Sequence, residues 1–339
     1  MKSNSVSNQT AKRSNRRLAA VLTALALLLA LPIYAQVSYT SDTTNFVTVT
    51  YNGTSNASVV IASNVKDYVT ATVSGGTVSI VQASTVSAST CGEIIYNLTG
   101  SSTNGTFYME GSYKATVELN GLTLTNPSGP AVNIMNGKRI EVSAKKGTTS
   151  TLTDGTSTET DAWKGAFYCK GHTEFKGKGT LNVYGNYAHA IFSKEYMSVK
   201  NCTINVYSAV KDAIHCKEYF LMESGAINLS GFLSDGIECN LDGTTSTGET
   251  TNHEDEDSGN IYILGGTLTI NMSSSSGESI KQDGTKTVSS DATVAVNGAN
   301  GVEEVESQNS QAVSKVIQDG VLHIKKNGKM YNALGAEIK

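Results

Sequence analysis

Acidic side chains recur at a fixed interval in the second half of the chain. Asp212 precedes an Ala-Ile pair, Asp235 precedes Gly-Ile 23 residues later, and Glu278 precedes Ser-Ile after a longer gap. His189 holds the equivalent position one interval before Asp212. Neighbouring carboxylates repel unless a cation or a proton lies between them, and Ca²⁺ takes about 6–8 oxygen ligands. The pattern predicts a Ca²⁺ site made by Asp212, Asp235 and Glu278, or else acids that cap their own turns.

Two further columns of side chains repeat with the acids. If strands alternate inward and outward positions, one outward column is aromatic or ionisable and the next is rich in lysine. Aromatic rings beside polar groups suit a sugar ring, and lysines suit the carboxylates of acidic sugars. The alternative is a solvated lysine ladder balanced by Glu195 and Glu218. The predicted substrate-binding residues are Tyr168, Lys170, Phe192, Lys194, His215, Lys217 and Glu238.

The same interval identifies the elements that position these residues. The segments "GTLNV" (179–183), "CTINV" (202–206) and "GAINL" (225–229) are again 23 residues apart. A repeat of this length, made of at least two short strands and turn residues, is typical of a parallel β-helix. The consensus of leucine-rich repeats is missing. Stacked coils bury apolar columns, here Ile191, Ile214 and Ile237 in one and Leu181, Ile204 and Ile227 in another.

Five cysteines occur in the chain. Cys169, Cys216 and Cys239 fall at inward positions with Ser193, which predicts small packed thiols. A bridge between Cys216 and Cys239 is an open alternative. A metal–thiolate site is disfavoured because no two cysteines have the CxxC spacing.

The chain divides into five predicted segments. Residues 1–35 carry basic residues before an apolar run and indicate an export signal cleaved after Ala35, with an uncleaved anchor as the alternative. No later stretch is long enough to span a bilayer, so we expect a secreted, surface or periplasmic protein. Residues 36–115 are predicted to be an N-terminal β cap, 116–300 the solenoid, 301–315 a linker, and 316–339 a hairpin tail with turns at Asp319-Gly320 and Asn327-Gly328.

Charge narrows the class of partner. Without residues 1–35 the chain has 21 basic and 30 acidic residues, a net charge of about −9. Nucleic acid is an unsuitable partner, because phosphate binding needs a basic surface. The insertion at 240–260 contains Glu254 to Asp257, which we expect to form a solvated loop or, alternatively, to close over the site. The sequence makes no prediction of oligomeric state.

Several segments carry a family resemblance. They are "VELNGLTLTNPSGPAVNI" (117–134), "STLTDG" (150–155), "GKGTLNVYGNYAHAI" (177–191), "VKDAI" (210–214), "LSDGIEC" (233–239) and "GNIYILGGTLTI" (259–270). In this order they resemble a bacterial family of secreted carbohydrate-binding domain-containing proteins over residues 46–300. The tail resembles C-terminal segments of secreted Bacteroidota proteins, some of which serve in sorting.

The resemblance implies a right-handed parallel β-helix, similar to pectate lyases, that binds acidic polysaccharide such as polygalacturonate with Ca²⁺. The family tends to repeat Asp-Gly-Ile, which this chain keeps only at 235–237. Asp212 is close to the pattern, whereas His189 and Glu278 depart from it. A Ca²⁺ site that needs an acid at position 189 would be weakened.

Four functions remain open at this point. The first is an exported, non-catalytic carbohydrate-binding protein. The second is a polysaccharide lyase with Lys194, Lys217 or His215 as the base. A glycoside hydrolase would pair Asp212 with Asp235 or Glu238. The last is a structural surface protein or adhesin.

Overall fold

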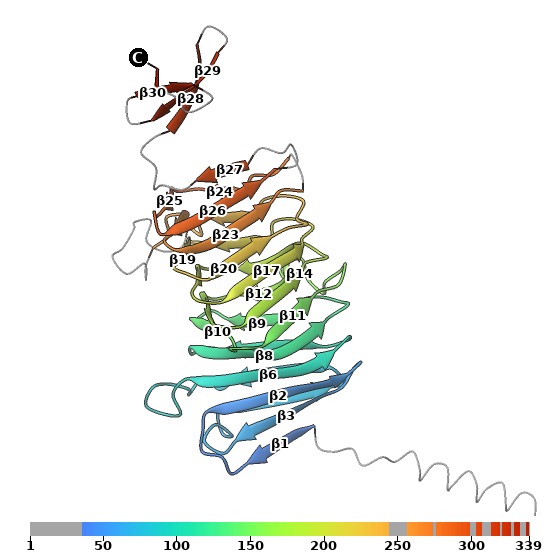
Figure 1. Ribbon diagram of the computed structural model, residues 1–339. Coiled ribbons are helices and arrows are strands. Elements are labelled where there is room, and N and C mark those ends of the chain that lie inside the picture. Colours follow the sequence, from blue (N-terminus) through green and yellow to red (C-terminus); the bar gives the residue numbers. More distant parts are fainter. Residues whose placement is uncertain are drawn as a thin grey trace, which may run out of the picture.

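The computed structural model describes residues 36–243, 256–273 and 276–298, together with the strands β27 to β31 between residues 303 and 338. These residues form strands and turns and contain no helix (Figure 1). The predicted all-β class is confirmed. None of the described residues forms a helix long and apolar enough to cross a membrane. The predicted export signal, residues 1–35, lies outside the described residues.

The coils of the solenoid each contribute three strands, one to each of three walls. Every strand pairs in parallel with its equivalent in the next coil. The five regular coils are β12 to β14 (Gly165–Cys169, Thr173–Gly177, Thr180–Tyr184), β15 to β17 (His189–Ser193, Met197–Val199, Thr203–Ser208), β18 to β20 (Ile214–Lys217, Tyr219–Met222, Ala226–Leu229), β21 to β23 (Ile237–Asn240, Asn260–Ile263, Gly266–Asn271) and β24 to β26 (Ile280–Gln282, Lys286–Val288, Ala292–Asn297).

The earlier coils follow the same plan with longer strands. β9 to β11 span Val132–Asn136, Ile140–Ala144 and Thr149–Thr153, and β8 (Ala115–Thr125) pairs with both β10 and β11, so it serves two walls. Parallel pairing continues back through β7 (Thr106–Gly111), β6 (Ile94–Ser102) and β5 (Thr77–Gln82). Parallel coils therefore extend into residues 36–115, the predicted cap.

Antiparallel pairs occur at both ends of the stack. At the first end β2 (Phe46–Gly53) pairs with β3 (Ala57–Ala62), beside β1 (Val37–Thr40), and β4 (Val69–Ser74) pairs with β5. At the other end β27 (Glu303–Glu306), inside the predicted linker, pairs with β26. Antiparallel strands of this kind interrupt the parallel edge that an open solenoid would expose. The handedness of the coils stays a prediction.

The apolar columns predicted from the repeat are confirmed. Ile191, Ile214 and Ile237 are direct neighbours on successive coils, and all three are fully buried. The column of Leu181, Ile204 and Ile227 lines another wall in the same way. Because stacked strands lie about 4.8 Å apart, each side chain packs on its equivalent one coil away. Burial of these columns is the main force that holds the stack together.

All five cysteines are buried free thiols. Cys216 and Cys239 are neighbours in register, but they form no disulfide. Cys169 and Ser193 are register partners on the two coils that precede Cys216. The packed-thiol prediction is therefore confirmed, and the alternative of a Cys216–Cys239 bridge is wrong for this structure.

The C-terminal segment forms a separate antiparallel sheet. Its strands are β28 (Val313–Gln318), β29 (Val321–Lys326), β30 (Lys329–Asn332) and β31 (Glu337–Ile338). The predicted turn residues at 319–320 and 327–328 lie outside the described residues. The strands that flank both positions nevertheless pair as two hairpins, as the sequence predicts.

Candidate functional site

One wall of the solenoid carries a continuous line of outward side chains, which we call the outer column. This wall is the sheet β4-β5-β7-β9-β12-β15-β18-β21-β24. The register of its strands aligns eight residues, one per coil. The outer column consists of Ser79, Tyr108, Asn133, Tyr168, Phe192, His215, Glu238 and Lys281. The sequence repeat identified this column only from Tyr168 onward.

Ion pairs join the last coils of the outer column, and we call this group the ionic network. His215 Nδ1 lies 2.9 Å from Asp212 Oδ2 and 3.1 Å from Glu238 Oε2. Lys281 Nζ lies 2.7 Å from Glu238 Oε1 and 3.2 Å from Asp235 Oδ2. Cations and carboxylates thus alternate from coil to coil, so the acids that the repeat brings together are neutralised by the chain itself.

The two aspartates of the ionic network also cap turns of the following coil. Asp212 Oδ1 accepts a hydrogen bond of 3.1 Å from the backbone N–H of Asp235. Asp235 Oδ1 in turn accepts one of 2.7 Å from the backbone N–H of Glu278. Both acids therefore cap a turn, but it is the turn of the next coil, and the alternative that they cap their own turns is wrong in this respect. The Glu278 side chain is exposed, and its role as a metal ligand stays a prediction.

Protonation follows from these contacts. Burial lowers the pKa of His215, but hydrogen bonds to Asp212 and Glu238 outweigh it and raise the pKa to about 9. Burial raises the pKa of Asp212, and the two histidines outweigh it, so that the net pKa is well below the usual range. His189 is 4% exposed, and burial lowers its pKa. At neutral pH His215 is therefore an imidazolium held between two carboxylates.

The network also bears on a metal site. Asp212, Asp235 and Glu238 place one oxygen each within 4.8 Å of the others, as do the ligand atoms of His189, Asp212 and His215. Carboxylate oxygens suit Ca²⁺. However, Lys281 and the protonated His215 already contact these carboxylates, so a bound ion would have to displace them. The arrangement fits self-neutralised acids better than a Ca²⁺ site, and Ca²⁺ binding stays a prediction.

The predicted aromatic platform is a stack of rings. Tyr168 and Phe192 lie 5.6 Å apart with an angle of 2° between their planes, and Phe192 stacks on His215 at 4.9 Å. Tyr168 is 2% and Phe192 is 7% exposed. The ring faces therefore contact one another, and little of either ring is left for a sugar. The role of both residues in binding stays a prediction.

The lysine column consists of Lys170, Lys194 and Lys217, and its members differ in exposure and in ion pairing. Lys170 and Lys194 are exposed, and neither forms an ion pair with a residue that the structure describes. Lys217 pairs with Asp242 at 2.8 Å. The predicted balance with Glu195 and Glu218 is not what this column shows, because Lys217 has another partner. The exposed lysines present two positive charges beside the outer column.

Those two glutamates form their own cluster with His172, beyond the lysine column. Glu218 Oε2 lies 3.3 Å from His172 Nε2 and accepts a hydrogen bond from the backbone N–H of Tyr196. Burial and the hydrogen bond to Glu218 raise the pKa of Glu195 to about 8. Glu195 is therefore mostly protonated at neutral pH, which limits any ion pair it makes with the lysines.

The acidic insertion departs from its prediction. Glu256 and Asp257 are 1% and 0% exposed. The Asp257 carboxylate accepts hydrogen bonds from the backbone N–H groups of Asp242 and Gly243, and Glu256 accepts one from the Tyr262 hydroxyl. The solvated-loop prediction is wrong for these two residues, which fasten the ends of the insertion. Glu254 and Asp255 lie outside the described residues.

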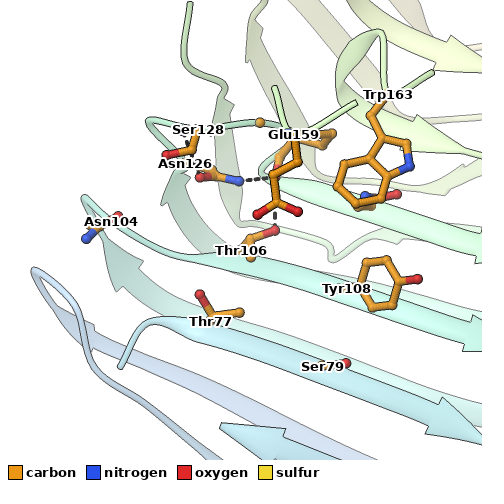
Figure 2. Close-up of a pocket in the computed structure, with 12 residues that line it drawn as sticks. Thr77, Ser79, Asn104, Thr106, Tyr108, Asn126, Ser128, Glu159 and Trp163 are labelled. Carbon is orange, nitrogen blue, oxygen red and sulfur yellow. Dashed lines mark hydrogen bonds between the residues drawn. The ribbon is translucent and has the colours of Figure 1, made fainter. Parts of the chain in front are cut away.

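A hollow of about 410 Å³ opens on the same wall, over the earlier coils. Its floor is the start of the outer column, and two loops at 126–130 and 154–164 stand beside it (Figure 2). The 23-residue repeat gives no sign of this hollow, which we call the N-terminal hollow. Its lining residues are Thr77, Ser79, Asn104, Thr106, Tyr108, Asn126, Ser128, Gly129, Pro130, Asn133, Glu159 and Trp163.

Comparison with known proteins gives a family and a similar fold. A family described as "Carbohydrate-binding domain-containing protein" matches residues 74–336. A solved structure, the polysaccharide lyase-like protein from C. thermocellum (gadolinium derivative), is similar with a TM-score of 0.51 and 18% sequence identity. The match covers 75% of this chain and 97% of that chain. No curated protein sequence matches significantly.

Proposed function

The chain belongs to the carbohydrate-binding domain-containing family, and from this premise we propose that it is an exported protein that binds polysaccharide without cleaving it. The family match over residues 74–336 carries the proposal, because it spans the wall with the outer column and the lysines. A long regular wall of stacked strands suits an extended polymer, since each coil presents equivalent side chains.

The exposed lysines favour uronate-containing polymers over this part of the wall. Lys170 and Lys194 stand on adjacent coils, one position beyond Cys169 and Ser193, which are register partners. A polymer that carries a carboxylate on each sugar residue offers repeated negative charge to such a column. A charged hydrogen bond is worth about 1.5–3 kcal/mol at best, and exposure to water reduces this, so binding needs several contacts at once.

The geometry of His215 supports binding rather than catalysis. A lyase needs a neutral base aimed at the proton next to a uronate carboxylate. The Nδ1 atom of His215 faces Asp212 and Glu238, and its pKa of about 9 keeps the ring protonated at neutral pH. A protonated imidazole accepts no further proton. Of the three candidate bases of the lyase hypothesis, Lys194, Lys217 and His215, the ionic network thus occupies His215.

A single assay tests the proposal. The purified protein is run through gels that contain polygalacturonate, with and without Ca²⁺, or a neutral polysaccharide. Absorbance of unsaturated products is followed in solution. We expect retention without new double bonds, and weaker retention for the double variant Lys170→Ala/Lys194→Ala. The control is Lys200→Ala, an exposed lysine of a different wall.

Appearance of unsaturated products would end the non-catalytic reading. If the double lysine variant is retained as strongly as the wild type, Lys170 and Lys194 are not part of the binding surface. Absence of retention with both acidic and neutral polymers would leave the structural surface protein as the better hypothesis.

A further inference from the structure

The N-terminal hollow differs from the rest of the wall in its chemistry. Its lining offers the hydroxyls of Thr77, Ser79 and Thr106 and the amides of Asn104, Asn126 and Asn133. Glu159 is the one charged residue among the lining residues, and none of them is a lysine or arginine. Its volume of about 410 Å³ falls in the usual range for ligand sites, about 300–1,000 Å³. This is a polar site without a cation, unlike the lysine column.

Aromatic rings stand at one end of the hollow. Trp163 and Tyr108 lie 6.1 Å apart with tilted planes. Figure 2 shows both rings at one side, the Glu159 carboxylate between them and Asn104, and the polar groups of Asn126 and Ser128 at the opposite side. Trp163 is half-buried rather than covered. An apolar surface facing a rim of donors and acceptors matches the two sides of a sugar ring.

A buried amide oxygen points to a missing ligand. Asn133 is 2% exposed and lines the hollow, and its Oδ1 accepts no hydrogen bond from any residue that the structure describes. Thr158 Oγ1, in the loop beside the hollow, is also buried and has no hydrogen-bond partner among the residues that the structure describes. Buried polar atoms in proteins nearly always have a partner, and leaving one unpaired is unfavourable. Because this oxygen is closed to solvent, a ligand hydroxyl would satisfy it once the Asn133 amide turns toward the hollow.

Other side chains hold the hollow in shape, and neither Asn133 Oδ1 nor Thr158 Oγ1 takes part. Asn126 Nδ2 donates to the carbonyl of Pro130 at 2.8 Å, and Thr106 Oγ1 donates to the same carbonyl at 2.9 Å. The second loop is fastened where the Tyr187 hydroxyl donates to Asp161 at 2.7 Å. Both walls are therefore built independently of Asn133, which is left free to contact a ligand.

We propose that the N-terminal hollow is a subsite for a neutral sugar residue, whose ring packs on Trp163 and whose hydroxyls bond Asn133 and the neighbouring threonines. This inference rests on the proposed function and extends it toward the first coils. Glu159 accepts hydrogen bonds from hydroxyls and repels a uronate carboxylate. The wall then has two zones, one for neutral sugars over β5, β7 and β9 and one for acidic sugars over the lysines.

Trp163 gives the proposal a direct test, because it is the only tryptophan in the chain. The purified protein is titrated with neutral β-1,4-linked hexasaccharides of glucose, xylose and mannose and with a galacturonate hexasaccharide. Tryptophan emission and calorimetric heat are recorded together. We expect a saturable change in emission with at least one neutral oligosaccharide, at the affinity that calorimetry gives, and a smaller change with galacturonate.

Substitutions of lining residues test which side chains contact the sugar. Asn133→Leu removes the amide at nearly constant size, and we expect it to weaken neutral binding about tenfold, as loss of one buried hydrogen bond does. Its melting temperature should not fall, since the amide oxygen has no partner to lose. Thr77→Val should weaken binding less, and the matched change Thr123→Val on another wall should leave it unchanged.

The outcomes separate this inference from the proposed function. Heat of binding without a change in emission, and with no effect of Asn133→Leu, overturns the subsite and leaves carbohydrate binding in place. A larger emission change with galacturonate than with any neutral oligosaccharide overturns the neutral class. Absence of binding to every oligosaccharide and to polygalacturonate overturns both.

Discussion

The two ends of the outer column lie on different strands of one sheet, and their polar side chains are in opposite states. At the ionic network each polar side chain has partners in the next coil, as with His215 between Asp212 and Glu238. At the N-terminal hollow Asn133 occupies the same column and its amide oxygen has none among the described residues. Regular stacking lets neighbouring side chains satisfy one another, whereas a site for an external ligand needs that regularity to be interrupted.

Coil length explains the interruption. Phe192, His215 and Glu238 follow one another at 23 residues, which leaves little chain for loops. Ser79, Tyr108, Asn133 and Tyr168 are separated by 29, 25 and 35 residues. The longest of these intervals contains the loop at 154–164, which stands beside the hollow together with the loop at 126–130. Loops of this kind commonly carry binding residues on a rigid scaffold.

The largest expected effect comes from breaking the ionic network. Asp212→Ala leaves the partly buried His215 without its closest carboxylate and removes the acceptor for the Asp235 N–H. Removing one partner of a buried pair costs about 3–5 kcal/mol. Urea denaturation should show a loss of this size at neutral pH, while Asp67→Ala, at an exposed site, stays within about 0.5 kcal/mol.

Urea denaturation of Asn133→Leu measures the same quantity at the N-terminal hollow. Its effect on the free energy of unfolding should be near zero or stabilising. If Asn133→Leu destabilises as much as Asp212→Ala, the hollow is structural and the contrast between the two regions is lost.

The second effect is a dependence of stability on alkaline pH. The folded pKa of His215, about 9, is raised above the unfolded value of about 6.5. The stabilisation is therefore fully present below about pH 6.5 and is lost as pH rises through about 9, with a total of about 3 kcal/mol at most. His215→Gln should flatten this fall in the unfolding free energy measured between pH 6.5 and 9.5.

His189→Gln provides the matched control. Burial lowers the pKa of His189, so its contribution is present at higher pH and is lost on the acid side of about pH 6.5. The alkaline fall should therefore persist in this variant. An alkaline fall that survives in His215→Gln as well would show that another group titrates.

A smaller effect tests the walls of the hollow. A Cβ built on Gly155 would lie 1.8 Å from the carbonyl oxygen of Pro127, so Gly155→Ala must push the two loops apart. Overpacking of this kind costs about 1–3 kcal/mol. We expect weaker binding of neutral oligosaccharides and a red shift of Trp163 emission. Gly137→Ala, which meets nothing within 4 Å, should change neither property.

The sequence predicts the regular part of this molecule well and the hollow not at all. Ile191, Ile214 and Ile237 stack as expected, because a constant interval puts equivalent positions in contact. Asn133 and Tyr108 belong to the same outer column, but unequal coil lengths hide them from any search for one period. The register of a wall is encoded by alternation within each strand, whereas the size of a hollow depends on loop conformation.

The sequence also does not predict which groups the polar side chains contact. The spacing of Asp212 and Asp235 indicates a shared role, yet spacing does not say whether a metal, a lysine or a backbone amide is the partner of each acid. Glu256 belongs to an acidic run that indicates a solvated loop, but its carboxylate is buried against the Tyr262 hydroxyl. Such choices depend on which groups three-dimensional packing leaves within about 3 Å.

The smallest expected effect asks whether the chain's own cation takes the place of a metal. Lys281 Nζ contacts both Asp235 and Glu238, and the Lys281 side chain is 44% exposed, so Lys281→Ala uncovers two carboxylates without opening the core. Added Ca²⁺ at ten times its dissociation constant then stabilises by about 1.4 kcal/mol, seen as a rise in melting temperature. Wild type should respond less, because Ca²⁺ competes with the ammonium group. Lys200→Ala, whose partner Glu223 lies on another wall, should behave as wild type. A larger rise in wild type than in Lys281→Ala would mean that Ca²⁺ binds with Lys281 in place, and the acids would then be a metal site after all.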